Sequence, residues 1–269
     1  KKIGLFKHYE CDFVINDLPK EAFSGIDTIF HLAAHTHDLS QKNDNKKYMD
    51  LNINLTKEII NLCLLNNVKK FIYLSSTKVY RKNNINLINE SSPEDADEIY
   101  GITKLESERC IKKICLENTN LKYLIIRSPL VYGPSVKGNL KIMQKAIRLR
   151  IMPPLPFFEN KKSLIHVDDL VKSLCLFMKN DDCLNNTFIV TDGHTYSSRE
   201  IYEIICRING ISIKKIFDTS ILYKALLSFP FIKFRLQKLF SNEHFSNKLI
   251  NKYGFNPSKL LQDMNETNF

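Results

Sequence analysis

Two long apolar runs constrain the fold more than any other feature of this sequence. They are "VKKFIYLSS" at residues 68–76 and "LKYLIIRSPLVYGP" at residues 121–134. A strand with so few polar interruptions is typical of the centre of a parallel sheet, where both faces are buried. Shorter apolar runs at residues 11–18 and 26–34 also read as strands, and residues 50–66 have the pattern of a buried helix. This alternation predicts βαβ units and an α/β fold with a parallel sheet.

The expected strands end in small or polar residues. Ligands of parallel α/β sheets bind at the carboxyl ends of the strands. A small residue there lets a ligand approach the backbone closely, although tight packing of strand on helix is an alternative reading. Because several such ends would lie on one edge of the sheet together with Tyr100, we predict a ligand site there. The ends concerned are Ala33-Ala34, Ser75-Ser76 and Ser128-Pro129.

Tyr100 and Lys104 form the strongest candidate for chemistry. They stand four positions apart in "YGITK", so on a helix they lie one turn apart on the same face. A free phenol titrates near pH ~10, which is too high for a base at neutral pH. A fixed ammonium nearby favours the phenolate, so we expect Lys104 to lower the pKa of Tyr100 and make it a proton shuttle. A chain this rich in lysine contains such a pair by chance, so the interpretation depends on its context.

The other polar motifs are interpreted as structural. No Cys or Glu completes a ligand set around the early histidines, so we predict no metal site. These histidines are His31, His35 and His37. We interpret His166 and Asp168 as a strand-to-helix corner with Asp168 as the helix N-cap, in preference to a metal site or a catalytic dyad. The sequence "SSRE" at Ser197–Glu200 predicts a capping box.

Composition narrows the functional classes. Hydrophobic residues make up 43% and charged residues 25% of the chain, which is ordinary for a globular protein, and no apolar run is long enough to span a membrane. Seven scattered cysteines without a Cys-x-x-Cys, and no recognisable signal peptide, lead us to expect a cytoplasmic protein with reduced thiols. The net charge of +10 includes no basic block with interleaved aromatic residues, so nucleic acid is not an expected partner. A basic cleft for an anionic small molecule is compatible with it.

Taken jointly, the motifs resemble those of the extended short-chain dehydrogenase/reductases, the NAD-dependent epimerase/dehydratase family acting on nucleotide sugars. The resemblance runs from Asp12 to Pro257. It implies a Rossmann-like, doubly wound parallel sheet in residues 1–135 and a smaller α/β substrate lobe in residues 136–269, of which residues 163–192 return to the sheet. The motifs that carry it are "HLAA" at 31–34, "SSTKVY" at 75–80, "YGITK" at 100–104, "RSPLVYGP" at 127–134, "SLIHVDDL" at 163–170 and "KYGFNP" at 252–257.

The resemblance also implies residue roles. It places Asp17 at the adenine of NAD, Lys104 at the nicotinamide ribose, and Asn139 and Lys162 at the diphosphate of the sugar nucleotide. Lys162 stands where the family usually has Arg and can act there only as a point charge. NADP stays open as the alternative cofactor. The implied catalytic residues are Ser76, Tyr100 and Lys104, and Ser76 also contacts the substrate. The implied cofactor-binding residues are Asp17, Leu18, Leu32, Ala33, Ala34, Ser75, Lys104, Pro129 and Val131.

The largest departure from the family is at the front of the chain. The family opens with a strand and a Gly-x-x-Gly-x-x-Gly turn whose amides meet the pyrophosphate at a helix N-terminus. The sequence printed here contains no such turn, so we expect the first βαβ unit, about 45 to 50 residues, to be largely missing. Because the chain begins with Lys1 rather than Met, we interpret it as an N-terminally truncated piece of an enzyme.

The resemblance favours a UDP-glucose 4-epimerase-like enzyme that transfers hydride at C4 of a UDP sugar. Thr77-Lys78 stand where the family's 4,6-dehydratases carry an Asp-Glu pair, which argues against dehydration. The first alternative is a reductase of UDP-4-keto sugars in surface-polysaccharide synthesis. The second is a non-catalytic binding protein with the same fold. Since Ser76, Tyr100 and Lys104 are all present, an enzyme is favoured. A homodimer is a candidate assembly, and the identity of the sugar stays open.

Overall fold

The computed structural model describes residues 7–11, 18–36, 45–81, 87–157, 159–213, 223, 236, 238–267 and 269. Asp17 and most of the strand expected at residues 11–18 lie outside these described residues. The chain divides into two compact units. The first unit comprises Lys1–Arg81, Pro93–Arg127 and Leu174–Phe188, and the second comprises Lys82–Ser92, Ser128–Ser173 and Ile189–Phe269. The domain boundary expected at residues 135–136 stays a prediction.

The first unit is built on a four-stranded sheet in the order β1-β2-β3-β6. β1 and β2 run parallel, with Thr28 opposite Lys70 and His31 opposite Tyr73. The two long apolar runs of the sequence form the central strands β2 and β3, and β2 ends at Ser76. The predicted Rossmann-like parallel α/β sheet is confirmed. The strands are β1 (Thr28–His31), β2 (Lys70–Ser76), β3 (Lys122–Ser128) and β6 (Asn186–Ile189).

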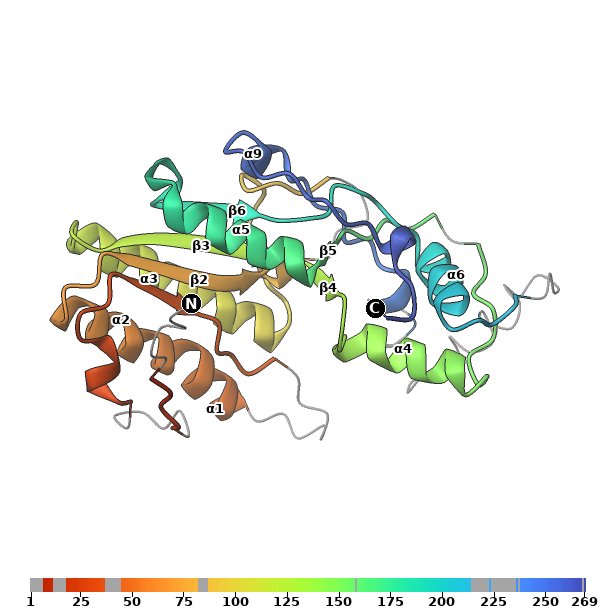
Figure 1. The fold of residues 1–269 in the computed structure, drawn as a ribbon, viewed down its shortest axis with the longest axis horizontal. Helices are drawn as coiled ribbons and strands as arrows, with labels where there is room; N and C mark the ends of the chain where they lie inside the picture. Colours follow the sequence, from red (N-terminus) through yellow and green to blue (C-terminus); the bar gives the residue numbers. More distant parts are fainter. Residues whose placement is uncertain are drawn as a thin grey trace, which may run out of the picture. The chain divides into compact units, whose positions relative to one another are not determined.

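Helices cover both faces of this sheet (Figure 1). On one face, α2 (Leu55–Leu65) and α3 (Ile99–Glu117) join β2 and β3 in a single apolar cluster. On the other face, the part of α5 (Val167–Lys179) that belongs to the first unit places Phe177 against Phe188 of β6, with the ring centroids 5.1 Å apart. Each buried side chain of this size stabilises the fold by about 1.5–3 kcal/mol. Members of the apolar cluster include Leu55, Ile60, Cys63, Phe71, Tyr73, Ile111 and Ile125.

The helix expected over residues 50–66 differs from a plain α-helix. α1 (Asn45–Tyr48) leads into a π-helical segment, η2 (Met49–Asn54), before α2 begins. Within that segment the Leu55 N–H bonds to the Asp50 carbonyl, five residues earlier. π-helical turns inside helices occur frequently at functional sites. Here the wider turn carries the buried Asn52.

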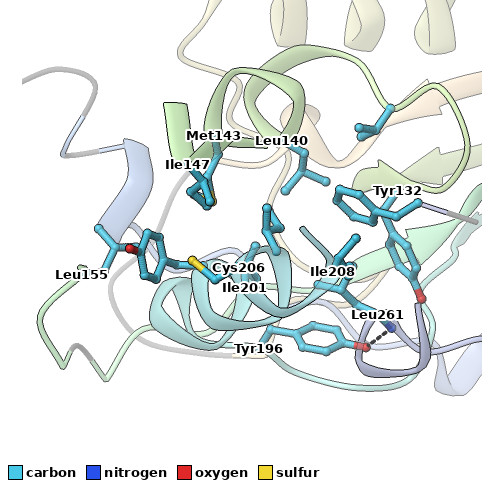
Figure 2. Packing of buried hydrophobic residues seen from close by; sticks show 14 of the residues in the cluster. Tyr132, Leu140, Met143, Ile147, Leu155, Tyr196, Ile201, Cys206, Ile208 and Leu261 are labelled. Carbon is cyan, nitrogen blue, oxygen red and sulfur yellow. Dashed lines mark hydrogen bonds between the residues drawn. The ribbon is translucent and has the colours of Figure 1, made fainter. Parts of the chain in front are cut away.

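The second unit has its own core. β4 (Leu130–Tyr132) and β5 (Leu164–His166) pair in parallel, and α4 (Gly138–Arg148) packs its apolar side chains near those of α6 (Ser198–Ile208), as Figure 2 shows. The predicted capping box at the start of α6 is confirmed. The Glu200 N–H donates to Ser197 Oγ (3.1 Å), and the Ser197 N–H donates to Glu200 Oε2 (2.6 Å). Shorter elements are η1 (Lys20–Phe23), η3 (Thr77–Val79), η4 (Asp181–Cys183), α9 (Lys248–Asn251) and η5 (Leu261–Asp263).

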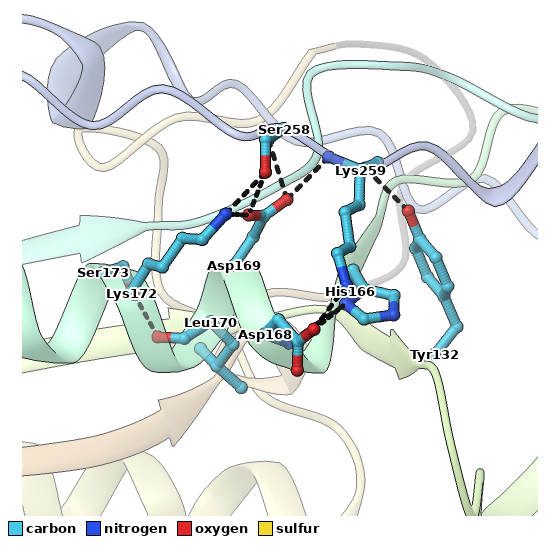
Figure 3. Close-up of polar contacts among 9 residues, drawn as sticks. All are labelled: Tyr132, His166, Asp168, Asp169, Leu170, Lys172, Ser173, Ser258 and Lys259. Carbon is cyan, nitrogen blue, oxygen red and sulfur yellow. Dashed lines mark hydrogen bonds and ion pairs between the residues drawn. The ribbon is translucent and has the colours of Figure 1, made fainter. Parts of the chain in front are cut away.

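The corner at His166 and Asp168 is structural, but the expected N-cap is wrong. α5 begins at Val167, directly after β5, so Asp168 lies inside the first turn. The Asp168 N–H donates to His166 Nδ1 (3.1 Å), which means that the imidazole caps the helix. The Asp168 carboxylate instead pairs with Lys259, while the Asp169 carboxylate accepts the backbone N–H groups of Ser258 and Lys259, both at 2.9 Å (Figure 3).

The described residues include neither a membrane-spanning helix nor a cluster of metal ligands. No helix among them is long and apolar enough to cross a membrane. The same residues contain no group of three His, Cys, Asp or Glu side chains that could hold a metal ion.

Candidate active site

The carboxyl end of β2 brings Ser76 and Tyr100 together in the first unit. Ser76 is the last residue of β2, and its Oγ accepts the Lys78 N–H (3.2 Å), which caps the short helix η3. Tyr100 lies in the first turn of α3, where its phenol is close enough to Ser76 for that side chain to lower its pKa. Two of the three predicted catalytic residues are therefore neighbours.

Gly101 makes this contact sterically feasible. A Cβ built on Gly101 would lie only 2.1 Å from the Lys78 carbonyl oxygen and 3.2 Å from the Ala96 Cβ. Since the nearest atom belongs to the backbone of η3, it cannot rotate away. α3 can approach η3, and bring Tyr100 to Ser76, only with glycine at this position. In the sequence, Gly101 was only one position of "YGITK", although its place beside Tyr100 was the available signal.

Lys104 lies one turn further along α3 and is buried, with 2% of its surface exposed. Its Nζ donates to the Leu74 carbonyl of β2 (2.8 Å) and lies 4.4 Å from the centroid of the Tyr73 ring. Burial lowers the pKa of Lys104 to about 7, and the Glu108 carboxylate partly opposes this shift. Lys104 therefore titrates near neutral pH.

The pKa of Tyr100 differs from the expectation. Burial raises the pKa of Tyr100 to about 12, although the hydrogen bond with Ser76 partly lowers it. The expected lowering by Lys104 is absent among the causes of this shift. The physical reason is that the Lys104 ammonium donates its hydrogen bond to the Leu74 carbonyl, and that burial favours the uncharged form of Lys104. The amino acids described here do not by themselves make Tyr100 a base at neutral pH.

Asn52 is a buried polar residue that the sequence analysis did not single out. Its Oδ1 accepts the His35 N–H (2.8 Å), and its Nδ2 donates to the His35 carbonyl (3.2 Å) and to Thr103 Oγ1 (2.9 Å). Asn52 therefore fixes the loop after β1 to α3 at a position between Tyr100 and Lys104. Residues 50–66 contain further asparagines, among them Asn54 and Asn61, so no signal in the sequence distinguished Asn52.

His31 lies at the end of β1 and is neutral. Its Nε2 is 2.8 Å from Thr56 Oγ1, and its ring contacts those of Phe71 and Tyr73. Burial, and then the Lys104 charge, lower the pKa of His31 to about 3. His31 is accordingly an uncharged neighbour of Lys104.

The residues predicted to hold a dinucleotide in this unit divide into two groups. Leu32, directly after β1, is 52% exposed, and the small Ala33 and Ala34 follow it half-buried. The exposed Leu32 side chain and the small residues after it form an apolar surface at the strand end, which is suited to packing against a planar ring. Leu18, by contrast, is buried in the apolar cluster, and Ser75 Oγ donates to Glu108 Oε1 (2.5 Å). Roles for Leu18 and Ser75 in cofactor binding, like those for Leu32, Ala33 and Ala34, stay predictions.

The remaining predicted ligand residues belong to the second unit. Pro129 and Val131 lie at and within β4, where Val131 is opposite Ile165, and Asn139 is exposed in the first turn of α4. Lys162 is buried: its Nζ donates to the Lys238 carbonyl (3.0 Å) and Ser241 Oγ (3.1 Å) and lies 3.8 Å from a carboxylate oxygen of Glu243. A diphosphate would have to compete for this ammonium, so its role stays a prediction.

We expect Gly101→Ala to disturb the site more than its size suggests. The added methyl cannot fit against the Lys78 carbonyl, so α3 and η3 must separate and the contact between Ser76 and Tyr100 must lengthen. Overpacking of this kind costs about 1–3 kcal/mol of unfolding free energy. Chemical denaturation and kcat measure the two effects, with Ile102→Ala, a change at a 40% exposed neighbour, as the control. A more stable Gly101→Ala protein with unchanged kcat would contradict this account.

Comparisons with known proteins identify the family. The family model described as "NAD dependent epimerase/dehydratase family" matches residues 2–190. The chain is 30% identical over 187 residues to a UDP-glucose 4-epimerase of Vibrio cholerae, covering 64% of this chain and 54% of that protein. It is 28% identical over 211 residues to a dTDP-D-glucose 4,6-dehydratase of Dictyostelium discoideum, covering 70% and 46%. The chain thus spans about half the length of the curated relatives it matches.

A solved structure with a similar fold agrees with this family. It is a UDP-glucuronic acid 4-epimerase from Bacillus cereus in complex with NAD, with a TM-score of 0.74 and 20% sequence identity, covering 94% of this chain and 76% of that one. Similarity at this identity supports the fold, and the family model covers most of the sequence. The chain belongs to the NAD-dependent epimerase/dehydratase family.

Proposed function

We propose that this protein is an NAD-dependent 4-epimerase of a UDP sugar, with Ser76, Tyr100 and Lys104 as its catalytic residues. The observation that carries the proposal is the proximity of Ser76 and Tyr100 at the carboxyl end of β2, with Lys104 buried one turn away. Ligands bind at this edge of parallel α/β sheets. The names of the Vibrio cholerae and Bacillus cereus relatives support 4-epimerisation.

In the proposed reaction the protein moves one proton. Tyr100 takes the proton of the sugar 4-hydroxyl and returns it after the C4 configuration has inverted, while Ser76 shares a hydrogen bond with the same oxygen. Leu32, Ala33, Ala34 and Lys104 would hold the cofactor. When bound, NAD would supply the hydride acceptor and donor for C4, and the positive charge of its oxidised nicotinamide would favour the Tyr100 phenolate.

Two neighbouring residues argue against dehydration. Elimination of water from the sugar needs further groups to move protons beyond C4. Thr77 and Lys78, which follow Ser76 in η3, supply a hydroxyl and an ammonium but no carboxylate. A 4-keto-sugar reductase remains the second candidate because the same three residues serve it.

The deciding experiment follows the sugar and the cofactor together. The full-length protein that contains this sequence is incubated with UDP-glucose, UDP-galactose or their N-acetyl forms, and the product is identified by NMR. Inversion at C4 with no net change in NADH is the expected result. Turnover of a UDP-4-keto sugar alone, with stoichiometric loss of NADH, would replace epimerase by reductase. Binding of a UDP sugar without either reaction would favour a non-catalytic protein.

A further inference from the structure

Glu108 is a fully buried carboxylate that the proposed reaction does not use. Its side chain is 0% exposed and accepts hydrogen bonds from β2 and β3. Arg127 Nε lies 3.1 and 3.2 Å from the two carboxylate oxygens, and Arg127 Nη2 lies 2.5 Å from Oε2. Ser75 Oγ donates to the other oxygen, Oε1 (2.5 Å). A buried charge with this many charge-assisted partners is fixed in position.

Glu108 also lies one turn beyond Lys104 on the same face of α3. Besides Tyr100 on the same helix, His31 from β1 and Tyr73 from β2 are titratable groups near Lys104. Both are neutral near pH 7, because burial lowers the pKa of His31 to about 3 and raises the pKa of the Tyr73 phenol. Glu108 is therefore, within the part of the chain that the structure describes, the carboxylate that favours the charged form of Lys104.

The same carboxylate holds the strand that carries Ser76. Consecutive residues at the end of β2 are bound by α3: the Leu74 carbonyl accepts from Lys104, and the Ser75 hydroxyl donates to Glu108. Ser76 follows directly. The Glu108 side chain thus acts electrostatically on Lys104 and also hydrogen-bonds Ser75, the residue before Ser76.

We propose that Glu108 is a positioning residue of the active site, which favours the ammonium form of Lys104 and fixes the end of β2 beside Tyr100. This inference rests on the proposed function for its kinetic part. It predicts that activity dependent on the Lys104 ammonium declines at a lower pH once the Glu108 charge is removed, because a buried cation without its carboxylate releases its proton more readily.

The test compares Glu108→Gln with Glu94→Gln. Both changes remove a carboxylate that pairs with Arg127, but only Glu108 acts on Lys104. In Glu108→Gln the alkaline limb of the kcat profile should move down by about one pH unit or more, whereas Glu94→Gln should leave it in place. A uniform loss of kcat with an unmoved limb, or equal shifts in both variants, would overturn the proposal.

A second readout does not depend on turnover. In protein labelled with ¹³C at lysine Cε, the Lys104 signal is assigned with Lys104→Arg and titrated by NMR. Its midpoint should fall in Glu108→Gln and stay unchanged in Glu94→Gln, and an unchanged midpoint in both overturns the inference.

A wild-type protein without 4-epimerase activity would defeat only the proposed function. If Glu108→Gln does not fold, Glu108→Asp is used instead, because it moves the carboxylate away by one methylene. The Lys104 midpoint must then fall as well, by less than the fall expected for Glu108→Gln.

Discussion

Replacing Tyr100 with phenylalanine is expected to lower kcat by ~10²–10⁴-fold while leaving the KM for the UDP sugar nearly unchanged. The ring would keep its place in the first turn of α3, so packing would be preserved. The lost hydroxyl is the group that contacts Ser76 and would exchange the proton of the substrate. Steady-state kinetics with the UDP sugar that the wild-type protein converts would measure both constants.

A matched control separates this chemistry from general damage. Tyr202→Phe removes the hydroxyl of a buried tyrosine in the core of the second unit. We expect its kcat to stay within a few-fold of wild type. A Tyr100→Phe protein that kept a near wild-type kcat would show that another group moves the proton, and the catalytic assignment would be abandoned.

The sequence was sufficient for the features that depend on local pattern. The long apolar runs became the central strands β2 and β3, and "SSRE" formed its capping box. The spacing of Tyr100 and Lys104 placed both in the first half of α3. Each of these follows from residues that are close in the chain, where periodicity and capping chemistry carry the information.

Features that depend on contacts between elements were not predictable in the same way. The space available at Gly101 is set by the Lys78 carbonyl, and the π-helical segment around Asn52 breaks a pattern that read as one helix. The pKa of Tyr100 was expected to fall, yet burial raises it, because desolvation depends on everything packed around the phenol. At the His166 corner, α5 begins directly after β5, so the His166 imidazole and not Asp168 caps it.

The buried ion pair of Arg127 and Glu108 illustrates the same limit. In sequence, Arg127 was only part of "RSPLVYGP", and Glu108 a polar position on a helix. In the structure their side chains are 1% and 0% exposed and form an ion pair. Burial of a charge without a partner costs free energy, so the charge of each residue offsets the cost of burying the other.

Arg127→Met is therefore expected to be the most destabilising single change considered, lowering the unfolding free energy by about 3–5 kcal/mol. The substitution leaves the Glu108 carboxylate buried without its main partner, since Lys112 is no closer than 4.0 Å. Urea denaturation at pH 7 measures the loss. Arg109→Met, a change on α3, supplies the control: Arg109 and its partner Glu106 are 55% and 46% exposed, so its loss should cost at most about 1 kcal/mol.

The double variant Arg127→Met/Glu108→Leu distinguishes a stranded charge from lost packing. If the cost of Arg127→Met arises from the unpaired carboxylate, removing that carboxylate as well should recover most of the lost unfolding free energy, as apolar replacements of buried ion pairs do. The coupling between the two positions should then be large, since they are in direct contact. A double variant whose loss equals the sum of the two single losses would instead assign the effect to the shape of the Arg127 side chain between β3 and α3.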